Sequence, residues 1–323
     1  MHSATRAHTT LPRRLGALRS QANTADSATT AIAVAAASQI APQIATAAAE
    51  FGERYGLSSS TSFTYFGFPL YLPEYQDLDV RRALSMAIDR DLIVEQIYQN
   101  TRVAAFSTLP PIFQGAREHV CDNWDYNPDE ARALWDSIDH PDSITVWFNT
   151  GGGHEEWVEA VANMWRNTLG IQDITFESLE FSEYNPLMDA QGATGPFRLG
   201  WGQDYPSPLN FLEPLFASYN TPPVASNNTW FNSPEFDELI AQGKTAVAAS
   251  GALADGIPFY QQAEDILCEE VPVAPVWFRT NQFVFGEGIG SVFYASPGSA
   301  PGGWGAGPPA AAPGAGDLAS LVA

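Results

Sequence analysis

A strand–helix–strand pattern between residues 143 and 176 is the feature that most limits how this chain can fold. Residues 143–149 alternate apolar and polar side chains, which predicts a strand, and a glycine loop follows at 151–153. Residues 154–168 then carry apolar side chains at helical spacing, and a second strand begins near Ile174. Because a helix between two strands normally connects parallel neighbours, the pattern predicts an α/β fold.

Other helices are marked by residues that cap the first turn. Asp89, Asn127 and Ser233 each precede an amphipathic stretch, and proline follows Asn127 and Ser233 directly. With the remaining periodic segments, these signals predict a mixed sheet with flanking helices. The further predicted elements are helices over 79–88 and 260–269 and strands over 197–201, 271–278 and 282–285.

The organised part of the 323-residue chain is predicted to be a single lobe, residues 59–290. Residues 1–58 are polar and alanine-rich, so we expect them to be poorly ordered or loosely helical. Residues 291–323 are rich in Gly, Pro and Ala and cannot build a core. We expect no cleavable signal peptide, because polar residues interrupt the alanine-rich stretch 28–49. No apolar run is long enough to predict a transmembrane helix.

The charge of the chain excludes one class of partner. The net charge is −22, so the chain repels phosphate backbones and we expect no nucleic-acid binding. Hydrophobic residues make up 45% of the chain, which is typical of a globular protein rather than a disordered one.

Two cysteines, Cys121 and Cys268, lie far apart in the sequence and show no metal-binding or redox spacing. In an oxidising compartment they can form one long-range disulfide. Two separate buried thiols are the alternative, and the sequence does not choose between them.

The familiar signatures of metal, phosphate and hydrolase sites give no support to those chemistries. His154, Glu155 and Glu156 are adjacent on a predicted helix, so their side chains point in different directions and cannot easily share one ion. The glycine loop at 151–153 lacks the lysine and hydroxyl residue of a phosphate-binding loop. No G-x-S-x-G motif occurs. We therefore expect no catalytic residue, no metal and no cofactor.

Segment 201–208 is the most informative part of the sequence. It places Trp201, Asp204 and Tyr205 directly after a predicted strand, and Pro206 and Pro208 stiffen the backbone that follows. Ligands bind at strand ends in open α/β sheets, and a carboxylate there can pair with an ammonium group. The alternative is a structural turn in which the two aromatic residues enter the core and Asp204 caps the next helix.

Several motifs, taken in their order along the chain, resemble those of a known family, the oligopeptide/dipeptide-type solute-binding proteins (family 5). The first segment is similar to the family pattern V-R-x-A-L-x-x-A-I-D-R, and the cleft segment is similar to W-x-x-D-Y-x-x-P. The similar segments are residues 80–90, 126–131, 201–208, 232–237, 260–264 and 271–275.

The resemblance implies the C-terminal lobe of a type II periplasmic-binding-protein fold, with the N-terminal lobe largely missing. It also implies an extracytoplasmic, monomeric component of an ABC importer that passes peptides to permease subunits in the membrane. In peptide-binding members the aspartate of the W-x-x-D-Y motif takes the α-ammonium group, a role that falls on Asp204. Trp201 would then line a side-chain pocket, and Tyr205 would flank the cleft.

Three alternatives remain open at this point. The protein can bind another solute, such as an oligosaccharide, a nickel chelate or an opine, or it can be a truncated and non-functional fragment. A secreted hydrolase that uses Glu180 and Asp204 as paired acids is the least supported, because such pairs need carboxylates about 5–9 Å apart across a cleft.

Overall fold

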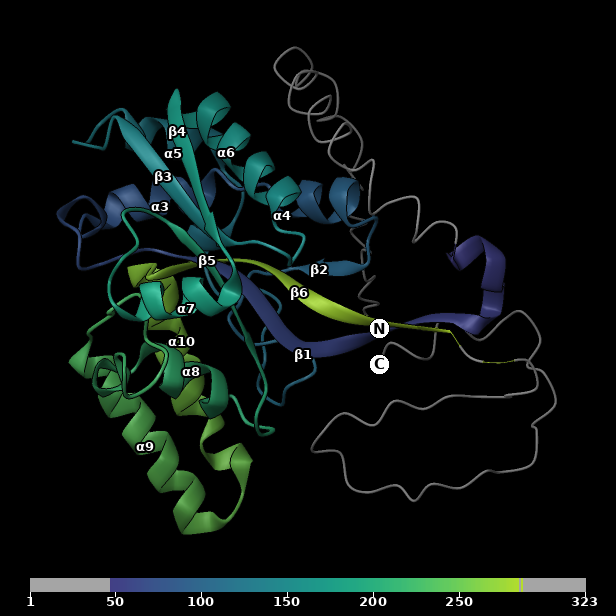
Figure 1. Ribbon diagram of the computed structural model, residues 1–323. Helices are drawn as coiled ribbons and strands as arrows, with labels where there is room; N and C mark the ends of the chain where they lie inside the picture. Colours follow the sequence, from purple (N-terminus) through teal and green to yellow (C-terminus); the bar gives the residue numbers. More distant parts are fainter. Residues whose placement is uncertain (1–46, 285, 287–323) are drawn as a thin grey trace, which may run out of the picture.

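One mixed sheet organises the molecule (Figure 1). The computed structural model describes residues 47–284 and residue 286. The strand order is β2-β6-β1-β5-β3-β4, and β3 runs parallel to both β4 and β5. The other pairings are antiparallel, which confirms the predicted mixed α/β sheet. The strands are β1 (Tyr55–Gly67), β2 (Arg102–Ala104), β3 (Ser143–Asn149), β4 (Asp173–Leu179), β5 (Phe197–Gly202) and β6 (Val273–Val284).

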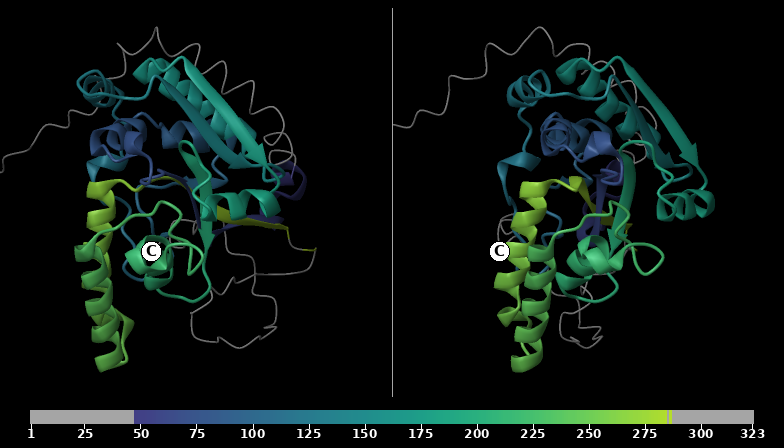
Figure 2. Two further views of the ribbon diagram at one scale, coloured as in Figure 1. Left: turned by 60° about the vertical axis from the view of Figure 1, so that its left-hand side comes forward. Right: turned by 90° about the vertical axis from the view of Figure 1, so that its left-hand side faces the viewer.

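Helices cover the sheet on both sides, and two hydrophobic clusters fill the space between the layers (Figures 1 and 2). Buried residues of α3, α5 and α6 contribute to the first cluster, and those of α8, α9 and α10 contribute to the second. The helices are α3 (Leu78–Met86), α4 (Arg90–Leu92) continued by a π-helical turn (Ile93–Ile97), α5 (Pro128–Trp135), α6 (Glu155–Leu169), α7 (Phe181–Asp189), α8 (Leu209–Phe216), α9 (Pro234–Ser250) and α10 (Ile257–Glu270).

The predicted caps begin the helices as expected. Asp89 accepts a hydrogen bond from the backbone N–H of Leu92 at 2.9 Å. Asn127 and Ser233 do the same for the first turns of α5 and α9, at 3.3 Å and 3.2 Å. Each cap satisfies an N–H group that has no partner within the helix, so these local signals were sufficient to locate the helix starts.

Strand β1 corrects the predicted start of the lobe. It begins at Tyr55, inside the segment 1–58 that was expected to be poorly ordered, and it runs for 13 residues. Its serine-rich first half lacks a clear apolar alternation, and pairing with β6 fixes its conformation instead, from Tyr55 opposite Val284 to Gly67 opposite Val273. Residues 1–46 and 287–323, including the predicted tail 291–323, lie outside the described residues.

Strand β6 is a second correction. The two late strands predicted over 271–278 and 282–285 are one continuous strand, β6, which pairs with β1 along its length and with β2 at its middle. Polar residues at 279–282 interrupt the apolar pattern, but the backbone ladder continues because both neighbours supply hydrogen-bonding partners. Helices α7 and α8 were not predicted, and each contains an internal proline that weakens a helical signal.

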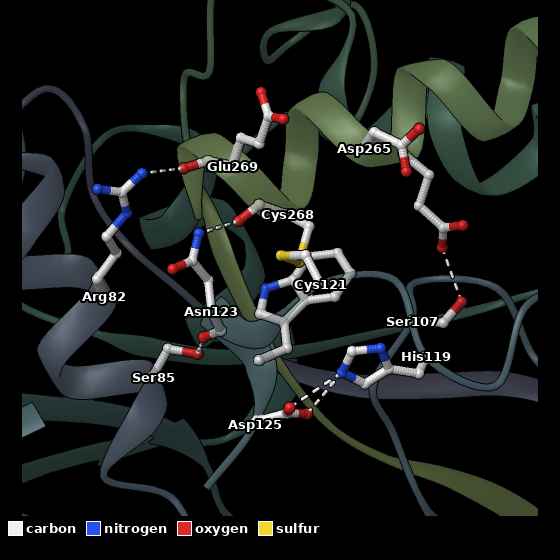
Figure 3. Close-up of a disulfide and its surroundings, with 12 residues drawn as sticks. Arg82, Ser85, Ser107, His119, Cys121, Asn123, Asp125, Asp265, Cys268 and Glu269 are labelled. Carbon is white, nitrogen blue, oxygen red and sulfur yellow. Dashed lines mark hydrogen bonds and ion pairs between the residues drawn. A yellow bond between two sulfur atoms is a disulfide. The ribbon is translucent and has the colours of Figure 1, made fainter. Parts of the chain in front are cut away.

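A disulfide joins Cys121 to Cys268 near the end of α10 (Figure 3). The two Cα atoms are 6.0 Å apart. Beside it, the Asn123 side chain donates a hydrogen bond to the Cys268 carbonyl at 3.0 Å, and the Ser85 hydroxyl donates to the Asn123 carbonyl at 2.8 Å. Of the two alternatives left open by the sequence, the structure therefore contains the disulfide, and it ties an irregular loop to α10.

Candidate functional site

Segment 201–208 lies at the end of β5, and its side chains reach the surface. Asp204 is exposed, and Tyr205 keeps 43% of its side-chain area accessible. Trp201 is half-buried and packs against the second hydrophobic cluster. Helix α8 begins after Pro208 with no side-chain cap, so Asp204 does not cap it. The alternative of a structural turn therefore fails for Asp204, which does not cap the helix, and for Tyr205, which does not enter the core. Only the Trp201 indole is partly buried as that alternative expects.

Asn210 organises this segment, and the sequence reasoning missed it. The residue is buried in the first turn of α8, and its Oδ1 accepts a hydrogen bond from the Asp204 backbone N–H at 2.8 Å. The same oxygen lies 3.4 Å from the Trp201 indole N–H, and the Asn210 amide donates to the Asp204 carboxylate at 3.5 Å. A polar residue within an otherwise apolar helical turn was the available signal.

The Asp204 carboxylate has no cationic partner among the described residues. The hydrogen bonds that involve this residue come from Asn210, which is neutral. Burial raises the pKa of the Tyr205 phenol and nearby Glu213 adds to the effect, so Tyr205 is a neutral hydroxyl at pH 7. The end of β5 therefore presents one exposed negative charge between two aromatic side chains.

Arg198, on the same strand, carries a second feature that the sequence did not reveal. Its Nη1 donates to the Asn149 side chain at 2.9 Å, and its Nε is buried without a hydrogen-bond partner among the described residues. Burial lowers the pKa of this guanidinium to about 10, which leaves it charged at neutral pH. The Coulombic neighbours that favour the charge are tyrosines (Tyr184, Tyr98 and Tyr65) rather than carboxylates.

His154 does not join Glu155 and Glu156 in a metal site. It is buried, and the Trp157 indole donates a hydrogen bond to its Nδ1 at 3.2 Å. Burial, together with the positive charges of Arg198 and Arg279, lowers the pKa of His154 to about 3. The imidazole is therefore neutral at physiological pH.

The groups considered for metal or acid chemistry are spread over separate places. His119, Asp122 and Asp125 have metal-ligand spacing, but they are surface groups and His119 already bonds to both Asp125 oxygens, at 2.9 and 3.0 Å. Glu180 accepts a hydrogen bond from the Thr150 hydroxyl at 2.7 Å before α7. No hydrogen bond joins Glu180 to Asp204 within the part of the chain that the structure describes.

Residues 19–223 match the profile of the bacterial extracellular solute-binding proteins, family 5 Middle. The chain belongs to this family. It is 28% identical to the oligopeptide-binding protein OppA of Bacillus subtilis over 227 residues, which cover 67% of this chain and 40% of that protein. It is 31% identical to the periplasmic oligopeptide-binding protein OppA of Salmonella typhimurium, over 64% of this chain and 38% of the relative. The chain thus spans about two fifths of the length of these relatives.

Solved structures of peptide-binding proteins share this fold. The murein tripeptide-binding protein MppA of Escherichia coli matches with a TM-score of 0.67 at 24% identity, over 76% of this chain and 48% of that one. The oligopeptide-binding protein AppA of Bacillus subtilis, in complex with a nonapeptide, matches with a TM-score of 0.65 at 20% identity, over 81% and 56%. The architecture is therefore that of a lobe of the type II periplasmic binding proteins. No helix in the described ranges has the length and apolar character needed to cross a membrane.

Proposed function

We propose that this chain captures peptides through their α-ammonium group, which the Asp204 carboxylate binds at the end of β5. The observation that carries this proposal is an exposed carboxylate without a cationic partner in the described structure, set between Trp201 and Tyr205. A peptide amine is positively charged at neutral pH, and a charge-assisted hydrogen bond to a carboxylate is stronger than one between neutral groups.

Asn210 supports this role because it fixes the backbone that carries the carboxylate. Its side chain holds the Asp204 N–H at 2.8 Å, so the acid does not have to be ordered when the ligand arrives. The Trp201 indole would line a pocket for a ligand side chain, and the Tyr205 ring would flank the cleft. Flat aromatic surfaces of this kind pack against many side chains, which suits a binding site for varied peptides.

The remaining parts of the proposal follow from family membership. We infer an extracytoplasmic protein that acts as a monomer, delivers its solute to an ABC permease in the membrane and performs no catalysis. Two relatives carry other names, a probable deoxycholate-binding protein and a heme-binding protein, both at lower identity than the OppA relatives given above. A solute without a free amine is therefore the main alternative.

Asp204→Asn tests the amine-binding role. We expect the affinity for a tripeptide such as Ala-Ala-Ala to fall about tenfold or more, because a charge-assisted hydrogen bond contributes about 1.5–3 kcal/mol. N-acetylation of the peptide should cause a similar loss with the unchanged chain and little further loss with the variant. Isothermal titration calorimetry or NMR titration measures both effects.

The matched control is Asp255→Asn, which removes an exposed carboxylate before α10, in a different part of the molecule from β5. Its peptide affinity should equal that of the unchanged chain. Equal affinity of the Asp204 variant, or tighter binding of the acetylated peptide, would contradict the proposal.

A further inference from the structure

Three side chains with metal-ligand atoms gather on one side of the irregular chain before α5. His119, Asp122 and Asp125 each offer one such atom, and these atoms all lie within 4.8 Å of one another. His119 and Asp122 are exposed and Asp125 is half-buried, so ions in the solvent can reach the cluster. Protein ligands lie about 2 Å from a bound zinc ion and therefore about 3–4 Å from one another. A small movement would bring the three atoms to a single ion.

His119 and Asp125 already have nearly the required separation. The His119 Nε2 atom lies 2.9 and 3.0 Å from the two Asp125 carboxylate oxygens, and Figure 3 shows the two side chains turned toward each other. A metal ion would take the place of the proton that these groups share. The Nε2 lone pair would then face the ion, and the ring proton would lie on Nδ1.

Contacts on the inner side of the segment hold the three ligands in place. Cys121 is joined to Cys268 by the disulfide, and the Asn123 amide donates to the Cys268 carbonyl at 3.0 Å. The indole of Trp124, which is fully buried, donates to the Val273 carbonyl at 3.1 Å. Because these anchors alternate with the ligands along the chain, little ordering is needed when an ion binds.

The same anchors keep two carboxylates close together without a basic partner. Among the residues that the structure describes, the ion pairs of Arg and Lys side chains do not include Asp122 or Asp125. Asp125 acts at longer range on the buried Arg90, but that guanidinium donates to backbone carbonyls and to the Ser85 hydroxyl. Like charges held close together repel each other, so a cation gains more here than at a single exposed carboxylate.

The mixture of donors indicates which cation fits. An imidazole nitrogen suits zinc, copper or nickel, whereas calcium and magnesium prefer oxygen ligands alone. Two carboxylates balance the charge of a divalent ion, and three protein ligands leave a fourth position of a tetrahedral zinc site for water. The sequence contained no warning of such a site, because the three residues stand three positions apart in an irregular segment and match no zinc motif.

We propose that His119, Asp122 and Asp125 bind one divalent transition-metal ion of the zinc type, with water as a further ligand. The ion would fasten the irregular chain between β2 and α5 beside the disulfide, and so stabilise the lobe. None of the three residues belongs to segment 201–208, so this inference does not depend on the proposed function.

The test is a calorimetric titration of zinc chloride into the full chain, without an affinity tag and after removal of metal with EDTA. We expect the unchanged chain to bind one ion, and His119→Gln and Asp122→Asn to weaken the affinity about tenfold or more. Zinc should also raise the urea midpoint of the unchanged chain, because an ion that binds only the folded form stabilises it. Calcium chloride at the same concentration should do neither.

His140→Gln is the matched control, because it removes another exposed histidine that stands between two exposed acids, Asp139 and Asp142. Its zinc affinity should equal that of the unchanged chain. The histidines at positions 2 and 8 remain in every variant, so zinc binding there would appear as equal affinity in all of them and would overturn the inference. Absence of zinc binding, or binding of calcium in preference to zinc, would overturn it as well. Both ligand variants replace exposed side chains, and circular dichroism without metal checks that they fold.

Discussion

Arg81 shows how one side chain can hold distant parts of the lobe together. Its guanidinium donates to the carbonyls of Glu270 and Val271 at the end of α10 and to the Tyr75 carbonyl. Val271 adopts a left-handed backbone, with φ of 45°, although it is β-branched and fully buried. That conformation is unfavourable for such a residue, so the hydrogen bonds from Arg81 compensate for local strain at the helix end.

We expect Arg81→Met to lower the free energy of unfolding by about 3 kcal/mol, because several buried carbonyls lose their donor together. Arg82→Met is the control. Arg82 is half-exposed and donates to the Glu269 carbonyl at 3.3 Å, so we expect its replacement to lower the free energy of unfolding by under about 1 kcal/mol. Urea unfolding followed by tryptophan fluorescence measures both. Equal losses for the two variants would contradict the capping role of Arg81.

His154 makes the stability of the lobe depend on pH. Its pKa is lowered to about 3 in the folded chain, whereas an unfolded histidine titrates near 6.5. Below about pH 6.5 the unfolded chain takes up a proton that the folded chain does not, so acidification favours unfolding. This residue should therefore contribute about 1–2 kcal/mol less stability at pH 5 than at pH 7.

His154→Gln should flatten this part of the pH profile, although the variant is less stable overall because it loses the bond to Trp157. His140→Gln, at an exposed position, is the comparison variant. Urea unfolding at pH 5, 6 and 7 gives the slopes to compare. An unchanged slope in the His154 variant would show that other groups cause the acid sensitivity.

Among the elements, the irregular chain between β2 and α5 depends on α10 for its position. Glu264, fully buried on α10, accepts hydrogen bonds from the Ser107 hydroxyl at 2.7 Å and the Thr108 backbone at 2.9 Å, and it pairs with Arg117 at 3.1 Å. The disulfide adds a covalent connection near the end of the same helix (Figure 3). The two attachments together replace the hydrogen-bond ladder that a regular element would have.

Replacing Cys121 and Cys268 with serine should lower the free energy of unfolding by about 4–5 kcal/mol in the chain-entropy model, because the bond closes a long loop. The sequence separation of the two cysteines is 147 residues. Urea unfolding of the oxidised chain, the reduced chain and the double variant measures the effect. Reductant should destabilise only the unchanged chain, and no difference between its two forms would contradict the prediction.

At the scale of the whole molecule, the sequence predicted those parts whose signals are local. The capped helices have their cues within a few residues, and the parallel β3–β4 pair is joined by a single intervening helix, so α/β architecture and the place of Asp204 followed directly. Strand β1 and the Arg102–Arg279 pair depend on residues more than 170 positions apart, and only the register of the sheet brings them together. Asn210 was missed although its partners Asp204 and Trp201 are close in sequence, because only the conformation of the turn after β5 brings them to its side chain.

Pairing of Tyr55 with Val284 places the two ends of the organised chain next to each other (Figure 1). A folded unit whose first and last residues lie side by side can be inserted into a surface turn of another protein without distorting either structure. Because the two ends are adjacent, a short linker can join them, and a circularly permuted version of the chain can then be opened at a surface loop elsewhere.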